Sequence, residues 1–536
     1  MSDIEETSTV IGLGFGNTTS AISYTNREGK AECIANEEGN RSIPSALSYV
    51  GGDEYHGDQA AAQLVRNPKN TVTCFRDFIG KDFSQVDPRS CALSAHPVEK
   101  DGEAAFKLSI ATSPEDSSPK DQIMTVAEIT ARHLIKVRDS AADFLGKSIS
   151  GVVVTVPTDF SDKQRATLEK IAKDAGVQIL QIIHEPVSAI LAYAALDHAS
   201  GVEMKDRNVV VADVGGTRTD VSVVSIRGGL FTILATAHDY SLGGSMLDDV
   251  LVEHFGKEFQ KKHKVDITGN TRALAKMKAQ CETTKKTLSA SSSATVSVES
   301  LAEGLDFHSS INRIRFETLG RKVFGQIADL IDSTIKKAEL ENFDINEVLL
   351  VGGTCHIPKL ASNISYNFPE FTKIRSPTTT SPSLNPSELS SLGAAVQASL
   401  IADYEEDEVI EGTQAIITSA PHLATPIGVK SGSDFITVLD VYTPLPSRRS
   451  IEIPYSSKIE IFEGKLDVKV TTLPAPEPDS EDEDDEPAEP QTEKSRIVVP
   501  GQKLAEVEVQ GGSGKTVTVM VQVDVESKVT VSARSN

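Results

Sequence analysis

Three glycines near the N-terminus, Gly12, Gly14 and Gly16, occupy alternate positions and are followed by Asn17 and Thr18. Apolar and β-branched residues flank this group, so the segment is predicted to form two strands joined by a tight polar turn. Backbone N–H groups in such a turn can bind a phosphate. The segment contains no carboxylate that could help to hold a magnesium ion. It is therefore suited to binding a phosphorylated ligand, and whether it also supports cleavage is left open.

A second segment, residues 209–224 (VVVADVGGTRTDVSVV), repeats this plan of apolar strand, glycine turn and apolar strand. Gly215 and Gly216 lie in its turn, and Asp213 and Asp220 stand on either side of them. Two equivalent hairpins predict two lobes, each of which offers a phosphate-binding turn to one cleft.

Familiar nucleotide motifs do not fit. In a dinucleotide fingerprint that starts at Gly12, the last glycine is replaced by Asn17. The segment GGSGKT, residues 511–516, lacks the first glycine of a Walker loop, because that position is Val509, and a strand is expected after it. A hairpin turn is the better interpretation of this segment.

The elements that must position these turns alternate up to about residue 400. VVVTVP, residues 152–157, reads as a buried strand. The helix after Thr125 opens with a capping box, and a second helix starts near Ser161 and ends before Gly176. The alternation of strands and helices predicts an α/β architecture.

The composition changes after residue 401. Residues 402–413 are acidic and read as a linker, and residues 414–536 show the short alternating runs of a small all-β domain. An insertion at about 475–496 interrupts these runs. Its PEPDSEDEDDEPAEP segment carries nine carboxylates and no base, so the insertion is expected to be disordered.

The net charge of −24 argues against direct binding to nucleic acid, so any work beside RNA is expected to go through a partner. The five cysteines are scattered and show no Cys-x-x-Cys pair, which is typical of free thiols in a reducing compartment. No signal peptide and no apolar run of membrane-spanning length is apparent. A cytoplasmic protein without membrane contact is therefore expected.

Five further blocks accompany the two hairpins in a fixed order: IIHEP (182–186), SLGGSMLDD (241–249), QCETTKKTLS (280–289), VLLVGGTCHIPKL (348–360) and NPSELSSLGAAVQ (385–397). Any one glycine pair among these segments would fit a plain turn. Together they resemble the nucleotide-binding domain of the seventy-kilodalton heat-shock chaperones, the DnaK-like family within the actin-fold ATPases. The resemblance covers essentially the whole chain. It implies an actin-like two-lobed ATPase domain (residues 1–401), followed by a truncated β domain without the family's helical lid.

The resemblance implies that the two hairpin turns contact the phosphates of ATP, that the helix around Lys285 holds the adenosine, and that Gly352 to Thr354 line the base pocket. The nucleotide-contacting residues expected in this way are Gly16, Asn17, Thr18, Gly215, Gly216, Thr217, Arg218, Gly244, Glu282, Lys285, Lys286, Ser289, Gly352, Gly353, Thr354 and His356. Three carboxylates, Glu185, Asp213 and Asp220, could organise Mg²⁺ through water, with no direct protein ligand to the metal.

The departures from the family pattern bear on hydrolysis. Gly14 replaces an aspartate near the metal's water shell, and Arg76 replaces the catalytic lysine. Arginine keeps the charge, but its broad planar fork does not match a compact ammonium. Because phosphoryl transfer depends on positioning and charge, these changes predict slow or absent hydrolysis.

Other departures lie in the second hairpin and near the base. A glycine becomes Thr217 and a threonine becomes Arg218, whose guanidinium could clasp a phosphate or point to solvent. The arginine that stacks on adenine aligns with His356, and an aspartate near the base aligns with Ser387. The linker has only Val409 and Ile410 as apolar residues, which predicts poor coupling between nucleotide state and client binding.

Within the family, the chain looks like the atypical member found at eukaryotic ribosomes. That likeness implies a heterodimer with a J-domain protein of the zuotin type, contact with ribosome and nascent chain through this partner, and stimulation of a second, hydrolysing chaperone of the same family. The partner is expected either on the edges of the β domain or between the lobes. Two rivals remain: an ordinary ATP-hydrolysing peptide chaperone, and a metabolite kinase on the same fold.

Overall fold

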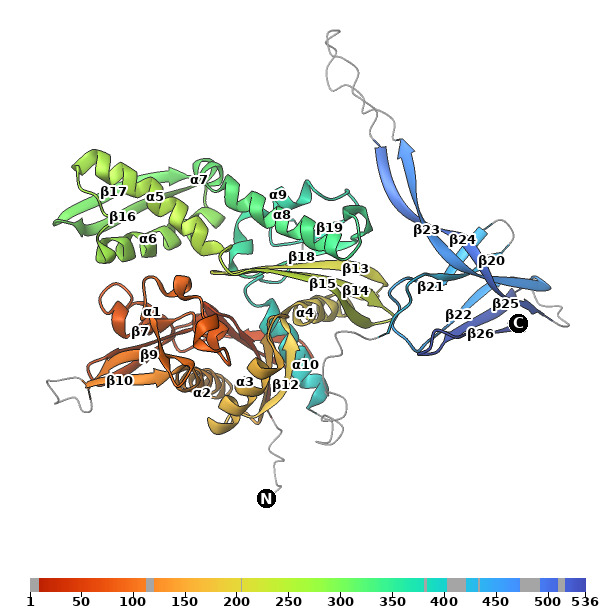
Figure 1. Ribbon diagram of the computed structural model, residues 1–536, viewed down its shortest axis with the longest axis horizontal. Coiled ribbons are helices and arrows are strands. Elements are labelled where there is room, and N and C mark those ends of the chain that lie inside the picture. Colours follow the sequence, from red (N-terminus) through yellow and green to blue (C-terminus); the bar gives the residue numbers. More distant parts are fainter. Residues whose placement is uncertain are drawn as a thin grey trace, which may run out of the picture.

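The computed structural model describes residues 9–111, 120–203, 205–379, 383–402, 421–431, 434–472, 492–509 and 516–536. Figure 1 shows two α/β lobes, one above the other, with a separate β domain beside the upper one. We define lobe I as residues 9–199 together with the helix 389–401, lobe II as residues 205–388, and the β domain as residues 421–536, in each case as far as they are described.

Lobe I is built on a sheet in the order β12-β11-β1-β2-β3, with β4 paired to β2. Its strands are β1 (Val10–Phe15), β2 (Thr19–Thr25), β3 (Ala31–Ile34), β4 (Ile43–Pro44), β5 (Ala46–Val50), β6 (Asp53–His56), β7 (Thr71–Thr73), β8 (Pro97–Lys100), β9 (Glu103–Ile110), β10 (Lys120–Thr125), β11 (Gly151–Val156) and β12 (Ile179–His184). Its helices are α1 (Gly57–Ala61), α2 (Val126–Leu145), α3 (Asp162–Asp174), α4 (Glu185–Ala199) and α10 (Leu389–Ile401).

Lobe II repeats the plan with a sheet in the order β15-β14-β13-β18-β19. Its strands are β13 (Arg207–Val214), β14 (Thr219–Arg227), β15 (Leu230–Asp239), β16 (Ser293–Ala302), β17 (Leu305–Asn312), β18 (Glu347–Val351) and β19 (Lys373–Arg375). Its helices are α5 (Gly244–His263), α6 (Thr271–Ala290), α7 (Arg313–Leu319), α8 (Arg321–Lys337) and α9 (Pro358–Ser365).

The two glycine segments form equivalent hairpins in these sheets. β1 pairs antiparallel with β2 and parallel with β11, while β13 pairs antiparallel with β14 and parallel with β18. The predicted internal repeat and the α/β class are thus confirmed, and the actin-like arrangement of two similar lobes follows from the duplicated sheet.

Local signals in the sequence set the ends of the lobe I helices. Thr125 and Glu128 form the expected capping box at the start of α2. Ser161 caps α3, and Gly176 follows its end with a φ of 68°. Every residue of β11 is buried, as expected for a strand that pairs in parallel on both sides.

Helix α10 lies directly on β1 and crosses α4 at very short range. A Cβ atom at Gly12 would lie 2.1 Å from the Ala395 backbone nitrogen, and one at Gly393 would lie 1.7 Å from the Ser188 carbonyl oxygen. Only glycine permits these approaches, so the first hairpin is anchored by close backbone packing.

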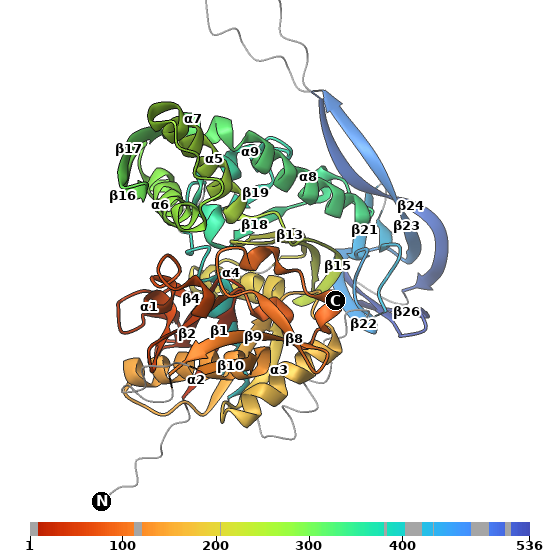
Figure 2. The same ribbon diagram turned by 60° about the vertical axis from the view of Figure 1, so that its left-hand side comes forward.

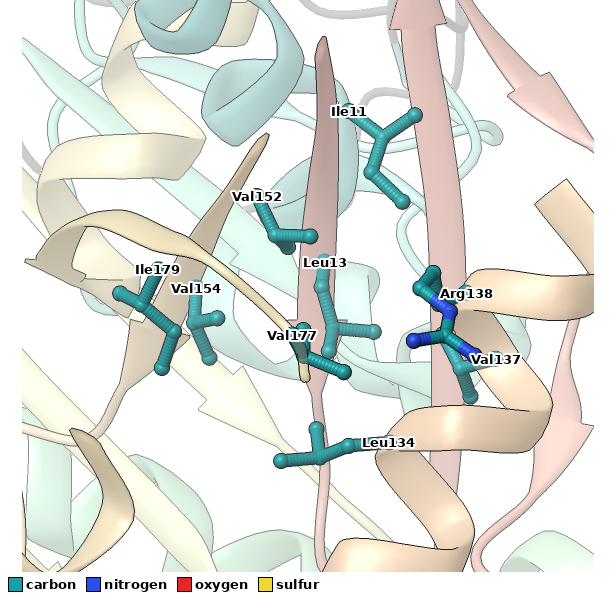
Figure 3. A pocket seen from close by; sticks show the side chains of 9 residues that line it. All are labelled: Ile11, Leu13, Leu134, Val137, Arg138, Val152, Val154, Val177 and Ile179. Atoms are coloured by element: carbon teal, nitrogen blue, oxygen red, sulfur yellow. The ribbon is translucent and has the colours of Figure 1, made fainter. Parts of the chain in front are cut away.

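The core of lobe I is tightly filled behind this hairpin. Figure 3 shows side chains from β1, β11, β12, α2 and the segment before β12 around a gap of only about 10 Å³, among them Leu13, Leu134, Val154 and Val177. A gap of that size holds about one water molecule and no larger ligand. The site must therefore be sought at the turns of the hairpins, outside the sheet core.

The β domain consists of two sheets, in the orders β21-β20-β23-β24 and β22-β25-β26. Its strands are β20 (Ile427–Ser431), β21 (Asp434–Leu439), β22 (Ser447–Pro454), β23 (Lys458–Thr472), β24 (Thr492–Glu508), β25 (Thr516–Val523) and β26 (Val529–Ser535). In both views β23 and β24 extend as a two-stranded arm beyond the rest of the domain (Figures 1 and 2). The part of this domain that the structure describes contains strands and no lid helix.

Ion pairs join the β domain to lobe II. Arg496 on β24 donates to both carboxylate oxygens of Asp344, at 2.8 and 2.6 Å, and its guanidinium lies 5.2 Å from the Phe343 ring. Arg449 on β22 contacts Asp206 at 2.7 Å. The β domain therefore packs against lobe II through several charged contacts.

Two segments predicted in this region, the linker and the acidic insertion, lie mostly outside the described residues. The linker 402–413 lies outside the described residues except for its first residue, and so does most of the acidic insertion. Residues 492–496, which the sequence assigned to the insertion, instead form the start of β24, because they pair with the far end of β23.

No helix among the described residues is long and apolar enough to span a membrane.

Candidate nucleotide site

The turns of the two hairpins touch each other across the lobes. Asn17 Nδ2 donates to Thr217 Oγ1 at 3.1 Å. A Cβ atom at Gly216 would lie 2.8 Å from the Thr18 side chain, so glycine is needed for this contact. The two turns thus lie side by side, as the predicted shared site requires, and their contacts with a phosphate stay a prediction.

Hydrogen bonds hold the second turn against lobe II. The Gly215 carbonyl oxygen accepts from the Gly244 backbone at 3.0 Å and from Thr354 Oγ1 at 2.9 Å. The Gly216 carbonyl oxygen accepts from the Ser245 backbone at 2.7 Å. The turn is thereby positioned by the start of α5 and by the short 3₁₀ turn Gly353–His356, both of which contain predicted nucleotide contacts.

Arg76 lies beneath the first turn and is 3% exposed. Its Nη1 donates to the Phe15 carbonyl oxygen at 3.0 Å and to Glu185 Oε1 at 2.9 Å. Its Nε and Nη2 donate to Asp77 Oδ1 at 3.0 and 2.8 Å. Four of the five guanidinium N–H groups are thus directed at protein acceptors, whereas a lysine here would present a single rotatable ammonium.

Arg218 is 4% exposed, so the alternative in which it points to solvent is wrong. Its Nε donates to Asp220 at 2.7 Å, and its Nη2 donates to Asp220 and, at 2.9 Å, to Asp159. Nη1 lies 3.4 Å from Asp77, and the guanidinium stacks 4.5 Å from the Tyr240 ring. Because Asp77 and Asp159 belong to lobe I, Arg218 ties the two lobes together.

The carboxylates around these arginines divide into two groups. Burial alone would raise the pKa of Asp77, but the charges of Arg76 and Arg218 outweigh it and hold that pKa below its usual value. Glu185 behaves in the opposite way: burial, with the neighbouring charges of Asp213 and Asp220, raises its pKa to about 8 despite Arg76. Burial and the charge of Asp220 raise the pKa of Asp213 to about 7. The site therefore holds more acidic groups than its two arginines neutralise.

Gly14 sits at the end of β1 with α10 behind it. A Cβ atom there would lie 3.1 Å from the Ser391 backbone nitrogen and 3.4 Å from the Ser390 Cβ atom. The position is tight for any side chain, and the first hairpin contributes no carboxylate to the site.

The residues of α6 that are expected to bind the adenosine make different kinds of contact within the protein. Lys285 Nζ donates to the Gly244 carbonyl oxygen at 2.9 Å and pairs with Asp248 at 2.8 Å, so it joins α6 to α5. Glu282 and Lys286 form an exposed pair one helical turn apart. Ser289 Oγ donates to the Lys285 carbonyl oxygen at 3.1 Å.

The base-pocket positions gather around Gly352, whose φ of 89° only glycine adopts readily. Its N–H donates to the Pro386 carbonyl oxygen at 2.9 Å. His356 Nε2 lies 3.1 Å from Asn385 Oδ1 and 3.2 Å from Ser387 Oγ. His356 and Ser387, the two departures predicted near the base, are thus hydrogen-bonded to each other.

Four residues of this site were missed by sequence reasoning: Asp77, Asp159, His238 and Tyr240. Asp159 follows β11, Tyr240 follows β15, and Tyr240 Oη donates to Asp159. One signal was available, because an arginine in a buried turn demands counter-charges nearby. This signal does not identify which of the chain's many acidic residues supply the counter-charges.

The arrangement suits binding better than cleavage. Glycine-rich turns of this kind can bind a phosphate through backbone N–H groups. The cationic groups that would stabilise a transferring phosphoryl group are instead directed at Glu185, Asp77, Asp159 and Asp220. Charge that is already committed in the ground state gives less stabilisation to the transition state.

Comparison with known proteins agrees with this geometry. Residues 10–453 match the family model "Hsp70 protein". The chain is 45% identical over 542 residues to a heat shock protein 70 homolog of Schizosaccharomyces pombe, with 100% of this chain and 95% of that protein covered. It is 44% identical to the ribosome-associated complex subunit SSZ1 of Saccharomyces cerevisiae, over 94% of this chain and 93% of that subunit.

A more distant relative is heat shock 70 kDa protein 2 of Paracoccidioides lutzii, at 32% identity over 85% of this chain and 67% of that protein. These matches span both lobes and leave the metabolite-kinase alternative without support. The duplicated hairpins, their meeting turns and the family match agree: the chain belongs to the Hsp70 family.

Proposed function

We propose that this chain binds ATP, hydrolyses it slowly if at all, and serves as a subunit of a ribosome-associated complex. The observation that carries the proposal is the 44% identity, over nearly the full length of both chains, to a protein whose name is ribosome-associated complex subunit SSZ1. The contacts of Arg76 and Arg218 support the part that concerns hydrolysis, because both guanidiniums are bound to carboxylates.

In this proposal the chain works in the cytoplasm as a heterodimer with a J-domain protein of the zuotin type. The partner supplies the contact with the ribosome, since a chain of net charge −24 is repelled by ribosomal RNA. The heterodimer then stimulates a second, hydrolysing chaperone of the same family that acts on nascent chains.

The test is co-sedimentation with ribosomes in a sucrose gradient, with and without the J-domain partner. The chain should enter the ribosomal fractions only with the partner, and the complex should raise the ATPase rate of the second chaperone. Sedimentation of the chain alone, or no stimulation by the complex, would contradict the proposal. Co-purification of the partner with a chain that lacks residues 413–536 distinguishes a partner on the β domain from one between the lobes.

An ordinary peptide-binding ATPase remains the second candidate, because the chain carries both lobes and a β domain. The two candidates differ in how strongly ATP changes peptide affinity. Our proposal expects a small change, because Val409 and Ile410 are the only apolar residues that the acidic linker offers for docking. A large ATP-dependent loss of peptide affinity would favour the second candidate.

A further inference from the structure

Three buried polar side chains connect helix α2 to the first glycine turn. His133 Nε2 on α2 lies 2.9 Å from Ser20 Oγ on β2, and Ser20 Oγ lies 3.0 Å from Ser45 Oγ. Ser45, between β4 and β5, donates its hydroxyl hydrogen to the Gly16 carbonyl oxygen at 2.8 Å. The three residues that carry these side chains are at most 2% exposed, so their polar atoms must find partners within the protein. One continuous series of hydrogen bonds therefore ties the turn to the core of lobe I.

The hydrogen atoms of this series can be arranged in only one way. A carbonyl oxygen carries no hydrogen, so Ser45 uses its single hydroxyl hydrogen on Gly16 and must accept from Ser20. Ser20 then accepts from His133 Nε2, which must carry a hydrogen. Burial lowers the pKa of His133 to about 3, so the ring is neutral with its hydrogen on Nε2. Every donor in the series thus points toward the glycine turn.

Ser45 contacts the turn a second time through its backbone. Its N–H donates to the Thr18 carbonyl oxygen at 2.9 Å, so the carbonyl oxygens of Gly16 and Thr18 are both directed at Ser45. The peptide bond between Gly16 and Asn17 is trans, and in a planar trans peptide the N–H points opposite to the C=O. The Asn17 N–H therefore points away from Ser45. Among the residues that the structure describes, no acceptor takes this N–H, so it is free to donate to a ligand.

The second turn uses the same arrangement with different residues. Gly215 follows β13 as Gly16 follows β1, and its carbonyl oxygen accepts from Thr354 Oγ1 at 2.9 Å. Thr354 is buried and, like Ser45, lies outside the hairpin. In each lobe a buried hydroxyl thus fixes the direction of the carbonyl oxygen of the equivalent glycine. Because the two donors come from unrelated segments, the shared feature is the orientation of the peptide.

The orientation of this peptide matters for an anionic ligand. A carbonyl oxygen is partly negative and repels a phosphate, whereas an N–H group attracts it. We propose that Ser45 is a positioning residue for phosphate binding: it holds the Gly16 carbonyl oxygen inside lobe I, so that the Asn17 N–H faces the phosphates of the nucleotide. Ser20 and His133 fix the direction of its hydroxyl. The inference rests on the proposed binding of ATP and adds residues outside the turn that make the turn competent for phosphate.

The test compares ATP with adenosine, because Ser45 acts on the phosphates alone. Calorimetric titration of the nucleotide-stripped full chain, with excess MgCl₂, gives both dissociation constants. Ser45→Ala should weaken ATP binding by about tenfold and leave adenosine binding within about twofold of wild type. Ser48→Ala is the matched control, because Ser48 is a buried serine on β5 that bonds to Thr71 Oγ1 at 2.8 Å, and it should bind both ligands like wild type.

The outcomes separate this inference from the proposed nucleotide binding. Unchanged ATP binding by Ser45→Ala, equal losses for ATP and adenosine, or the same loss in Ser48→Ala would overturn the inference while leaving nucleotide binding intact. No ATP binding by the wild-type chain would overturn the proposed binding and this inference with it.

Further variants decide the matter if Ser45→Ala does not fold, which far-UV circular dichroism shows. Ser45→Thr keeps the hydroxyl and should bind ATP within about threefold of wild type. His133→Phe removes the donor to Ser20 and should weaken ATP binding by about threefold with adenosine binding unchanged, whereas His133→Gln keeps an N–H donor and should restore it. Wild-type affinity for ATP in a folded His133→Phe would overturn the inference.

Discussion

The two glycine hairpins have the same backbone arrangement but are held in place by different kinds of interaction. The first hairpin, β1–β2, is anchored by steric fit: Gly12 lies against the backbone of α10, and Ser23 bonds to Ser391 at 2.7 Å. The second hairpin, β13–β14, is anchored by charge through Arg218, which pairs with Asp77 and Asp159 of lobe I. The two hairpins therefore share the shape of their turns. All of the charged side chains within the hairpins belong to the second one.

Under our proposal, the charge distribution separates phosphate binding from phosphate cleavage in this chain. Phosphate binding by such turns relies on backbone N–H groups, which do not depend on the side chains. Cleavage needs charges positioned on the reacting phosphoryl group. The first hairpin has no such charge at Gly14, and the second directs its arginine at carboxylates of both lobes.

The largest effect is expected from removing the charge of the second hairpin. Arg218→Ala leaves Asp77, Asp159 and Asp220 without their shared cation and should lower the free energy of unfolding by about 3–5 kcal/mol. Urea denaturation measures this, with the exposed Arg272→Ala on α6 as the control, which should change stability by less than about 0.5 kcal/mol. Equal effects at the two sites would mean that the ion pairs do not anchor this hairpin.

The corresponding change in the first hairpin is steric. Gly12→Ala places a Cβ atom 2.1 Å from the Ala395 backbone nitrogen and should cost about 3 kcal/mol. Gly14→Ala is the matched control, because its nearest contact is 3.1 Å, and it should cost less than about 1 kcal/mol in the same urea experiment. If Gly14→Ala were the more harmful change, packing on α10 would not be what holds β1.

Glu185, at the start of α4 in lobe I, should give the protein a pH dependence, because burial and the nearby charges of Asp213 and Asp220 in the second hairpin raise its pKa. The pKa of Glu185 is about 8 in the folded protein, above its usual value, so the folded state binds the proton more tightly. This contribution is present at low pH and is lost as the pH rises: about 2 kcal/mol should disappear between pH 6 and pH 8.

Glu185→Gln should abolish that part of the slope in urea titrations at several pH values. Glu282→Gln is the control, because the charge of Lys286 outweighs burial and keeps the pKa of Glu282 below its usual value, outside this pH range. An unchanged slope in Glu185→Gln would show that the carboxylate is not held in its protonated form.

The smallest effect is expected where the two hairpins meet. Thr217→Val keeps the shape of the side chain but removes the acceptor of the Asn17 amide, and should cost about 1 kcal/mol. Thr283→Val, on the exposed face of α6, is a control with the same chemical change. If the two substitutions cost the same, the contact between the turns would add nothing to stability.

Much of the scaffold could be predicted because its signals are local. The hairpins, the capping box at Thr125, the buried strand β11 and the glycine after α3 are each encoded within a few residues, and the structure has all of them. The start of β24 was misassigned, since residues 492–496 adjoin an acidic run and only their pairing with β23 shows that they form a strand.

The chemistry of the site was harder to predict, because it depends on side chains brought together from distant segments. Arg218 could be recognised as unusual, but spacing along β14 does not show where its guanidinium points. Its partners Asp77 and Asp159 come from separate loops of lobe I. Only the assembled lobes show that the arginine is buried in carboxylates.

The central claim is that these turns hold ATP and cleave it poorly, and single-turnover hydrolysis with protein in excess over ATP, in the presence of Mg²⁺, tests it most directly. The Hsp70 relative of Neurospora crassa, 33% identical to this chain, can be measured in parallel. We predict a rate constant at least about 100-fold below that of the relative, with ATP still bound at the end of the reaction. A rate constant within a few-fold of the relative's would contradict the account.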